Sequence, residues 1–255
     1  LPQKYLVSRI ADTLVDVVVM VPPGASPATW EATPAQMRSL DYAKVYFKIG
    51  HLGFEQAWMR RIAELNPDMD IVDMSKGLDL ISIDYKHGDH THSGIDPHIW
   101  MSPGRMEEMA RVVYSRLAAI FPENKEYLRS NYQQLMKEIV SINSYAKRQL
   151  LPWKGSDFLL FHPSLGYLAK DYGLRQHAIE FEGKEPSPGH LQEIINLAEK
   201  RGIKVIFVQE EFDQRNATVI MQEIGGTIVR INPLAEDWNT EMKNTINKLV
   251  KSFQK

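Results

Sequence analysis

The chain has 255 residues, 44% of them hydrophobic and 24% charged, and a net charge of −2. These values are typical of a globular protein with two ordinary domains or one large one. The weak net charge gives no basic field for nucleic acid or an anionic membrane, and no apolar run approaches the roughly 20 residues of a membrane-spanning helix. The chain has no cysteine, which excludes disulfides, thiolate metal sites and a cysteine nucleophile within it.

The first half of the chain alternates short apolar runs with amphipathic segments. A helical pattern begins at Tyr5 and Leu6, and the polar segment 77–94 is predicted to be a loop. The predicted strands are 15–21, 44–49 and 70–73, and the further predicted helices are 34–40, 54–65 and 103–121.

Residues 122–151 show the longest helical pattern in the chain, with apolar residues at steps of three and four. A helix of about 27 residues spans roughly 40 Å, which is longer than one lobe needs. We therefore expect a rod that joins two lobes, with an N-terminal lobe over 1–121, a linking helix over 122–151 and a C-terminal lobe over 152–255.

The second half repeats the alternation of strands and helices. Such alternation predicts parallel sheets with right-handed crossovers, and hence an α/β fold of two βα lobes with a ligand site in the cleft between them. The predicted strands are 158–161, 177–181, 203–208 and 227–231, and the predicted helices are 165–172, 188–201, 213–224 and 240–253.

Three histidines lie beside predicted strand ends or helix starts. His51 and His162 each follow a strand, and His98 precedes the helix that begins at Pro103. In an open α/β sheet, ligands bind outside the carboxyl ends of the strands. Each histidine alone is more typical of a capped turn or of packing at the surface. The three imidazoles together predict a transition-metal site, with zinc as the leading metal.

Two polar segments offer further metal chemistry. Residues 87–92 are rich in histidine and are either a solvated loop or a weak zinc-gathering loop. Glu210 and Glu211 follow a predicted strand, where a carboxylate would ligate metal or orient a ligand imidazole, unless they form only a solvated turn. Asn232 is a poor transition-metal ligand, so we expect a turn-forming or hydrogen-bonding role for it. The pair Gly225-Gly226 predicts a helix end.

The chain resembles the extracytoplasmic metal-binding proteins of zinc and manganese ABC importers. The matching stretches are 21–27 (Val-Pro-Pro-Gly-Ala-Ser-Pro), 96–103 (Asp-Pro-His-Ile-Trp-Met-Ser-Pro) and 161–168 (Phe-His-Pro-Ser-Leu-Gly-Tyr-Leu). The resemblance covers nearly the whole chain and implies two βα lobes joined by a long rigid helix, with the metal held between them.

The same resemblance places the family's second and third histidine ligands on His98 and His162. Its first histidine falls on Ala28, which cannot bind metal, and His51 is the obvious replacement. The usual aspartate ligand falls on Asn232 and a common glutamate falls on Gln209, so the fourth ligand stays open between Glu210, Glu211, a water molecule and none. Imidazole suits Zn²⁺ and manganese prefers oxygen ligands, so the ligand set favours zinc over Mn²⁺.

The implied function is capture of zinc outside the cytoplasm and delivery to a membrane permease of an ABC importer, without any catalysed reaction. We expect a monomer with no nucleic-acid partner, which is periplasmic or otherwise extracytoplasmic and is lipid-anchored through a segment upstream of Leu1. One alternative is a zinc hydrolase, with three histidines and a water on the metal and Glu210 or Glu211 as base. The other is a cell-surface adhesin with a structural metal.

Overall fold

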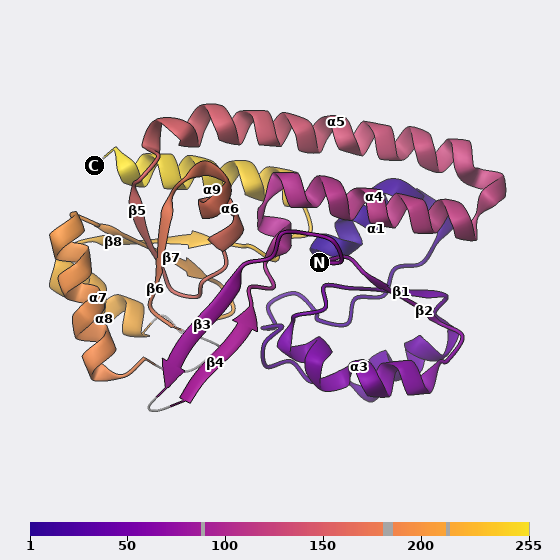
Figure 1. Cartoon of the computed structure of the whole chain (residues 1–255), viewed down its shortest axis with the longest axis horizontal. Coiled ribbons are helices and arrows are strands. Elements are labelled where there is room, and N and C mark those ends of the chain that lie inside the picture. The colour runs from indigo at the N-terminus through magenta and orange to yellow at the C-terminus, as the bar shows by residue number, and fades with distance from the viewer. Residues whose placement is uncertain (88–89, 181–185, 213–214, 255) are drawn as a thin grey trace. The chain divides into compact units, whose positions relative to one another are not determined.

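The computed structural model describes residues 1–87, 90–180, 186–212 and 215–254 (Figure 1). The chain divides into two compact units, residues 1–140 and 141–255, and the division falls inside the long helix α5 (Lys125–Leu150). The predicted α/β fold with parallel sheets and a long helix is confirmed. The predicted domain limits at 121 and 151 stay a prediction. In the described part of the chain, every helix falls short of the length and apolarity that crossing a bilayer requires.

The first unit contains a parallel pair of strands and an antiparallel hairpin. Strand β1 pairs with β2 in parallel, and β3 pairs with β4 in antiparallel register. Its elements are α1 (Pro2–Ala11), η1 (Asp12–Leu14), α2 (Pro34–Ser39), η2 (Leu40–Tyr42), β1 (Val45–Lys48), α3 (Gly53–Leu65), β2 (Asp70–Asp73), β3 (Ser82–His87), β4 (His90–Ile95), η3 (Ile99–Met101), α4 (Pro103–Ile120), η4 (Pro122–Asn124) and the first part of α5.

Apolar stripes on the helices of the first unit hold it together. Helix α3 buries Phe54 and Ile62 in a core with Met20, Leu40 and Met69, as its helical spacing predicts. Helix α1 packs against α4. An ion pair joins α1 to α5, because Nη1 and Nη2 of Arg9 donate to the Glu138 carboxylate at 2.8 and 2.6 Å.

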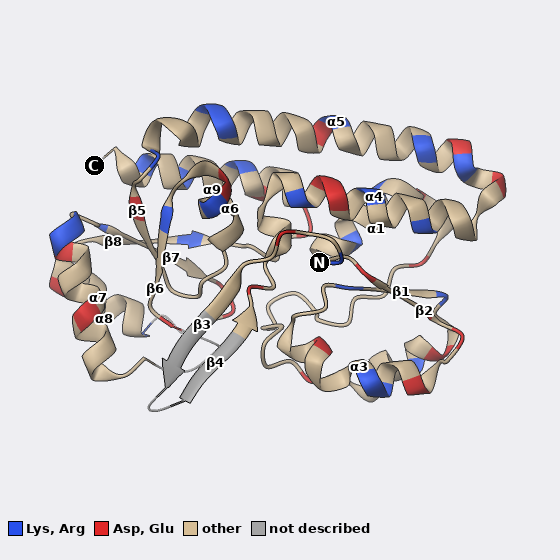
Figure 2. Ribbon diagram, viewed as in Figure 1, with Lys and Arg blue, Asp and Glu red and all other residues tan. Residues whose placement is uncertain are grey.

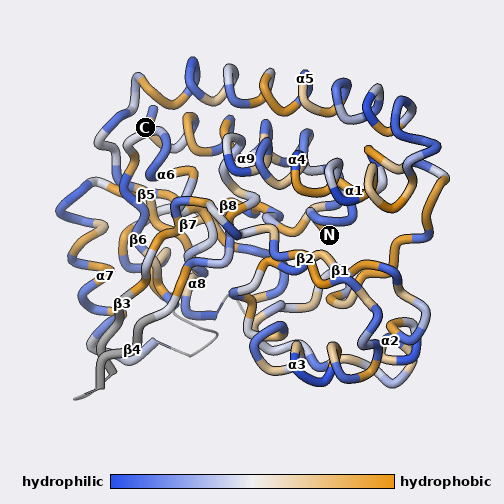
Figure 3. Tube along the Cα trace, turned by 45° about the vertical axis from the view of Figure 1, so that its right-hand side comes forward, coloured by the Kyte–Doolittle hydropathy of each residue, from blue (hydrophilic) through white to orange (hydrophobic). Residues whose placement is uncertain are grey.

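The second unit is a four-stranded parallel sheet in the order β6-β5-β7-β8. Its central strand β7 is buried throughout and carries no charged residue (Figures 2 and 3), which is the pattern expected when helices cover both faces of a parallel sheet. Its elements are the end of α5, η5 (Leu151–Trp153), β5 (Asp157–Leu160), α6 (Gly166–Tyr172), β6 (Arg175–Ala178), α7 (Pro188–Arg201), β7 (Val205–Gln209), α8 (Arg215–Ile224), β8 (Thr227–Ile231) and α9 (Trp238–Phe253).

In the second unit, the predicted and observed ends of the helices and strands agree within three residues wherever the end lies in the described part of the chain. Helix α7 and strand β8 have the predicted bounds. Gly225 follows α8 in the left-handed conformation, with φ of +59°, as predicted for a helix end. Residues 181 and 213, at the ends of a predicted strand and a predicted helix, lie outside the described residues.

The predicted strand over residues 15–21 is wrong. The segment pairs with no strand of the described chain, although exposed residues such as Val18 alternate with more buried ones. Two backbone carbonyl groups of this segment instead accept hydrogen bonds from a side chain in α2. Nε2 of Gln36 donates to the carbonyl oxygens of Val19 and Met20 at 3.3 and 2.8 Å. Strand propensity alone did not decide the conformation, because a strand also needs a pairing partner.

The predicted loop over residues 77–94 is also wrong, because it contains the hairpin of β3 and β4. Its polar composition lacks the apolar alternation by which a strand is recognised in a sequence, whereas the hairpin is held by its backbone ladder. The zinc-gathering role predicted for residues 87–92 concerns side chains that lie outside the described part of the structure.

Candidate metal centre

His162 lies directly beyond the carboxyl end of the buried strand β5. Strand β5 pairs in parallel with β6 and β7, so the residues that follow these strands gather at one edge of the sheet. Glu180 comes just after β6, and Gln209 is the last residue of β7. The position that the sequence predicted for His162 is therefore confirmed within the second unit.

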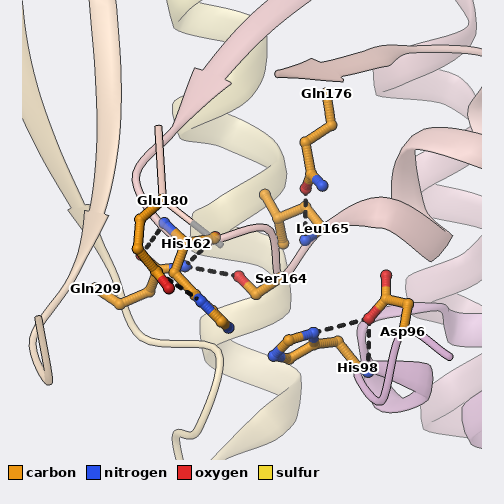
Figure 4. A network of polar contacts seen from close by, with 8 residues as sticks. All are labelled: Asp96, His98, His162, Ser164, Leu165, Gln176, Glu180 and Gln209. Atoms are coloured by element: carbon orange, nitrogen blue, oxygen red, sulfur yellow. Dashed lines mark hydrogen bonds and ion pairs between the residues drawn. The ribbon is translucent and has the colours of Figure 1, made fainter. Parts of the chain in front are cut away.

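The imidazole of His162 is oriented by a buried carboxylate. Its Nδ1 lies 2.9 Å from Oε2 of Glu180, a residue only 3% exposed (Figure 4). An ionised carboxylate can only accept a hydrogen bond, so the hydrogen sits on Nδ1. Nε2 is then the ring nitrogen that carries no hydrogen, and the carboxylate raises its basicity.

Gln209 holds the backbone around His162. Its Oε1 accepts the His162 backbone N–H at 3.3 Å, while its Nε2 donates to the His162 carbonyl at 2.7 Å and to Ser164 Oγ at 2.8 Å (Figure 4). A glutamate could not make the two donations. The side chain is fully buried, so this residue positions the histidine turn.

The two glutamates after β7 differ in their surroundings. Glu210 is exposed, whereas Glu211 is partly buried. Burial raises the pKa of Glu211, and the nearby His162 acts in the opposite direction.

The carboxylate that orients His162 is Glu180, which the sequence analysis missed. No local spacing joins Glu180 to His162, and only the pairing of β5 with β6 brings them together.

An aromatic ring covers one face of the His162 imidazole. Phe212 stacks on it with ring centroids 4.6 Å apart and planes 17° apart, and also contacts Phe161. This contact restricts rotation of the imidazole about its Cβ–Cγ bond. The histidine is thus held by a carboxylate, a backbone clamp and a ring.

His98 repeats the carboxylate–imidazole pair in the first unit. Oδ1 of Asp96 accepts the His98 backbone N–H at 2.9 Å and lies 2.8 Å from its ring Nδ1 (Figure 4). Asp96 is 3% exposed, and its own N–H donates to the carbonyl of Ile81, just before β3. The motif Asp-Pro-His therefore supplies both the imidazole and its orienting carboxylate, and the hydrogen of the neutral ring again sits on Nδ1.

His51 follows β1, and its ring contacts a serine hydroxyl. Its Nε2 lies 3.3 Å from Oγ of Ser75, and that hydroxyl donates to Oδ1 of Asp73 at 2.6 Å. Nζ of Lys48 lies 2.9 Å from Oδ2 of the same aspartate. This chain of polar contacts joins the ends of β1 and β2.

A buried glutamate shapes the turn that carries His51. Glu55 in α3 accepts the backbone N–H groups of Ile49 and Gly50 at 2.9 and 2.6 Å. Burial raises the pKa of Glu55 to about 7, although the two backbone hydrogen bonds favour the charged form. Gly50 has φ of +91°, and a Cβ there would lie 3.1 Å from Asp73, so the turn requires glycine.

The structure places the remaining candidates as follows. Asn232 forms a turn, because its Oδ1 accepts the N–H of Leu234 at 3.1 Å, and the prediction for it is confirmed. Among the side chains that the structure describes, which leave out those of residues 84–93, no three histidine, aspartate or glutamate residues form a ready-made metal-binding group. The assignment of His51, His98 and His162 as metal ligands stays a prediction.

Comparisons with known proteins agree on one family. A family model described as zinc-uptake complex component A, periplasmic, matches residues 1–252. The high-affinity zinc uptake system protein ZnuA of Bacillus subtilis (strain 168) is 26% identical over 266 residues, covering 99% of this chain and 78% of that protein. The zinc-binding lipoprotein AdcA of Streptococcus pneumoniae (strain ATCC BAA-255 / R6) is 31% identical over 154 residues, covering 59% of this chain and 31% of that protein.

A solved structure extends the likeness to three dimensions. The crystal structure of a ZnuA deletion mutant with zinc bound has a TM-score of 0.90 and 32% sequence identity to this chain. The match covers 98% of this chain and 94% of that one. The similarity therefore spans both units.

Proposed function

Since the chain belongs to the family of zinc-uptake complex component A, periplasmic, we propose that it captures Zn²⁺ outside the cytoplasm and delivers it to the membrane permease of an ABC importer. The family is one of metal-binding transport proteins and is not an enzyme family. We propose further that the chain catalyses no reaction, acts as a monomer and is tethered to the membrane by a lipid, as the lipoprotein among its relatives suggests.

The observation that carries this proposal is the repeated pairing of an imidazole with a buried carboxylate. Asp96 holds His98 and Glu180 holds His162, each through Nδ1, at 2.8 and 2.9 Å. Pairs of this kind fix the tautomer and ring direction of metal-ligating histidines. Imidazole nitrogen suits zinc, whereas manganese prefers oxygen ligands, so we propose Zn²⁺ as the cargo with Mn²⁺ as the weaker ligand.

We propose His51, His98 and His162 as the protein ligands, and the fourth position is taken by a water or by Glu211. Asn232 is the weaker candidate for this role, because its Oδ1 already accepts the Leu234 N–H and a neutral amide binds transition metals poorly. Release to the permease follows if the permease binds the metal-free conformation more tightly than the zinc-bound one.

The direct test is zinc binding by the purified protein. Elemental analysis and titration against a chromophoric chelator should give one zinc per chain, with Mn²⁺ bound far more weakly. His98→Ala and His162→Ala should each lower the affinity, and the double variant should lose less than the product of the two losses, because both residues bind one ion. Multiplicative losses, or unchanged binding in either single variant, would contradict the proposed site.

A further inference from the structure

His51 differs from the other two predicted ligands in which ring nitrogen lies beside the orienting side chain. In His98 and His162 a buried carboxylate contacts Nδ1. In His51 the partner, Ser75 Oγ, contacts Nε2 at 3.3 Å. A neutral imidazole carries one hydrogen, so the nitrogen that donates to a partner is not the one that binds metal.

The position of the hydrogen on His51 follows from the next residue along the relay. Oδ1 of Asp73 lies 2.6 Å from Ser75 Oγ and also accepts the backbone N–H of Ser75 at 2.9 Å. An ionised carboxylate has no hydrogen to give, so the single hydroxyl hydrogen of Ser75 goes to Asp73. Ser75 Oγ is then an acceptor toward His51, and the imidazole must donate from Nε2.

The far end of the relay keeps Asp73 in its charged form. Burial raises the pKa of Asp73, but the hydrogen bonds from Ser75 and Lys48 outweigh burial and lower it below its ordinary value. Ser75 is 4% exposed, which limits competition from water for its hydroxyl. The Asp73 carboxylate is held between two neighbours. Nζ of Lys48 lies 2.9 Å from its Oδ2, and Gly50 packs so closely that a Cβ there would lie 3.1 Å from the same oxygen.

We infer that Ser75 and Asp73 are positioning residues that hold His51 in the Nε2–H form, so that His51 binds zinc through Nδ1. This inference rests on the proposed function, because it takes His51 as a zinc ligand. The metal would thus be bound by two different ring nitrogens in one site, Nε2 of His98 and His162 and Nδ1 of His51. Nδ1 is attached to Cγ and lies nearer the backbone than Nε2, so His51 would bring its turn closer to the ion.

The test is nitrogen NMR of the full chain labelled with ¹⁵N-histidine, with His51 assigned by its loss in His51→Gln. In the zinc-free protein, two-bond ¹H–¹⁵N correlations should show hydrogen on Nε2 of His51 and on Nδ1 of His98 and His162. When zinc is added, the Nδ1 signal of His51 and the Nε2 signals of the other two should shift.

Ser75→Ala separates positioning from a general effect on stability. Without the hydroxyl, the His51 nitrogen signals should move toward values averaged over the two tautomers, and zinc affinity should fall about tenfold. Ser39→Ala is the matched control, because it also removes a hydroxyl from the first unit, one that donates to the Gln36 carbonyl. It should leave both the tautomer and the affinity unchanged.

Three other results of the NMR experiment would overturn either the relay, the role of His51 or the proposed function. Hydrogen on Nδ1 of His51, or a zinc-induced shift of its Nε2, would overturn the relay and leave His51 as a ligand. Zinc-induced shifts at His98 and His162 without any at His51 would overturn this inference and leave a zinc site without His51. An absence of shifts at all three residues would overturn the proposed function itself.

Discussion

The His162 turn and the His51 turn hold their imidazoles in place by different contacts. His162 is held directly by a buried carboxylate, by a backbone clamp and by a stacked ring. His51 is held through a serine hydroxyl, with the carboxylate one residue further away. A direct carboxylate both orients an imidazole and raises its basicity, whereas a hydroxyl relay mainly selects the tautomer. We therefore expect zinc affinity to fall more when a partner of His162 is substituted than when a partner of His51 is substituted.

Acidification should have the largest effect on zinc binding, and its slope counts the imidazoles that bind. Each ligand must lose a proton, and the reference pKa of histidine is about 6.5. Affinity should therefore fall steeply as pH falls from about 7.5 to about 5.5, and each imidazole that binds adds to the slope. Chelator competition at a series of pH values measures this slope.

The slope also tests whether His51 belongs with the other two. In His51→Ala the decrease over the same pH range should be smaller, because one fewer proton competes with the metal. Circular dichroism at each pH confirms that the fold is retained. The same slope in His51→Ala and in the unaltered protein would remove His51 from the site.

Deletion of a ligand at pH 7.5 should have the next largest effect. We expect His162→Ala to lower zinc affinity by more than about 100-fold, because each lost ligand removes a direct metal bond. His51→Ala should have a comparable effect if it replaces the histidine absent at Ala28. His190→Ala, on α7, is the control and should bind zinc as the unaltered protein does. If His51→Ala bound zinc as tightly as His190→Ala, His51 would not be a zinc ligand, and its turn would not be comparable with that of His162.

Loss of an orienting carboxylate should weaken binding without abolishing it. Glu180→Gln and Asp96→Asn keep the shape of each side chain but remove its charge, so we expect losses of about 10- to 100-fold. The controls are Glu199→Gln and Asp68→Asn, at exposed positions. Losses no larger than that of Ser75→Ala would show that direct carboxylates and the hydroxyl relay are equivalent.

The sequence predicted the second unit better than the first for a physical reason. Strand β7 contains the continuous apolar run 205–208, and burial on both faces makes such a strand recognisable. The segment 15–21 has the same β-branched character, but its conformation depends on a distant side chain, Gln36. The hairpin of β3 and β4 depends on a backbone ladder between polar residues, which leaves little trace in the sequence.

The candidate site shows the same limit. Histidines beside strand ends could be found from the sequence because strand ends and turn residues can be located locally. Asp96 lies within the same motif as His98, but Glu180 and Ser75 contact their histidines across sequence separations of 18 and 24 residues. The partners of His162 and His51 therefore depend on strand register, which only the folded structure supplies.

Neutralisation of Glu55 should have the smallest effect on zinc and a clear effect on stability. Its pKa is raised from 4.5 to about 7, so between these pH values the folded chain holds a proton that the unfolded chain has released. More protons bound in the folded state means that stability falls as pH rises through this range, by about 3 kcal/mol for a shift of this size. Glu55→Gln should remove that decrease, because glutamine does not titrate, and should keep zinc affinity within about threefold, because its oxygen still accepts one backbone N–H of the His51 turn.

Urea unfolding at pH 5, 6 and 7 measures the effect as a difference between variant and unaltered protein, which cancels the contribution of the histidines. Glu64→Gln lies on the same helix with an exposed side chain and should leave the slope of stability against pH unchanged. A parallel decrease in Glu55→Gln and the unaltered protein would mean that Glu55 is ionised throughout this range. The two backbone N–H groups of Ile49 and Gly50 would then outweigh burial, and the His51 turn would be held by a fixed negative charge at every pH at which zinc binds.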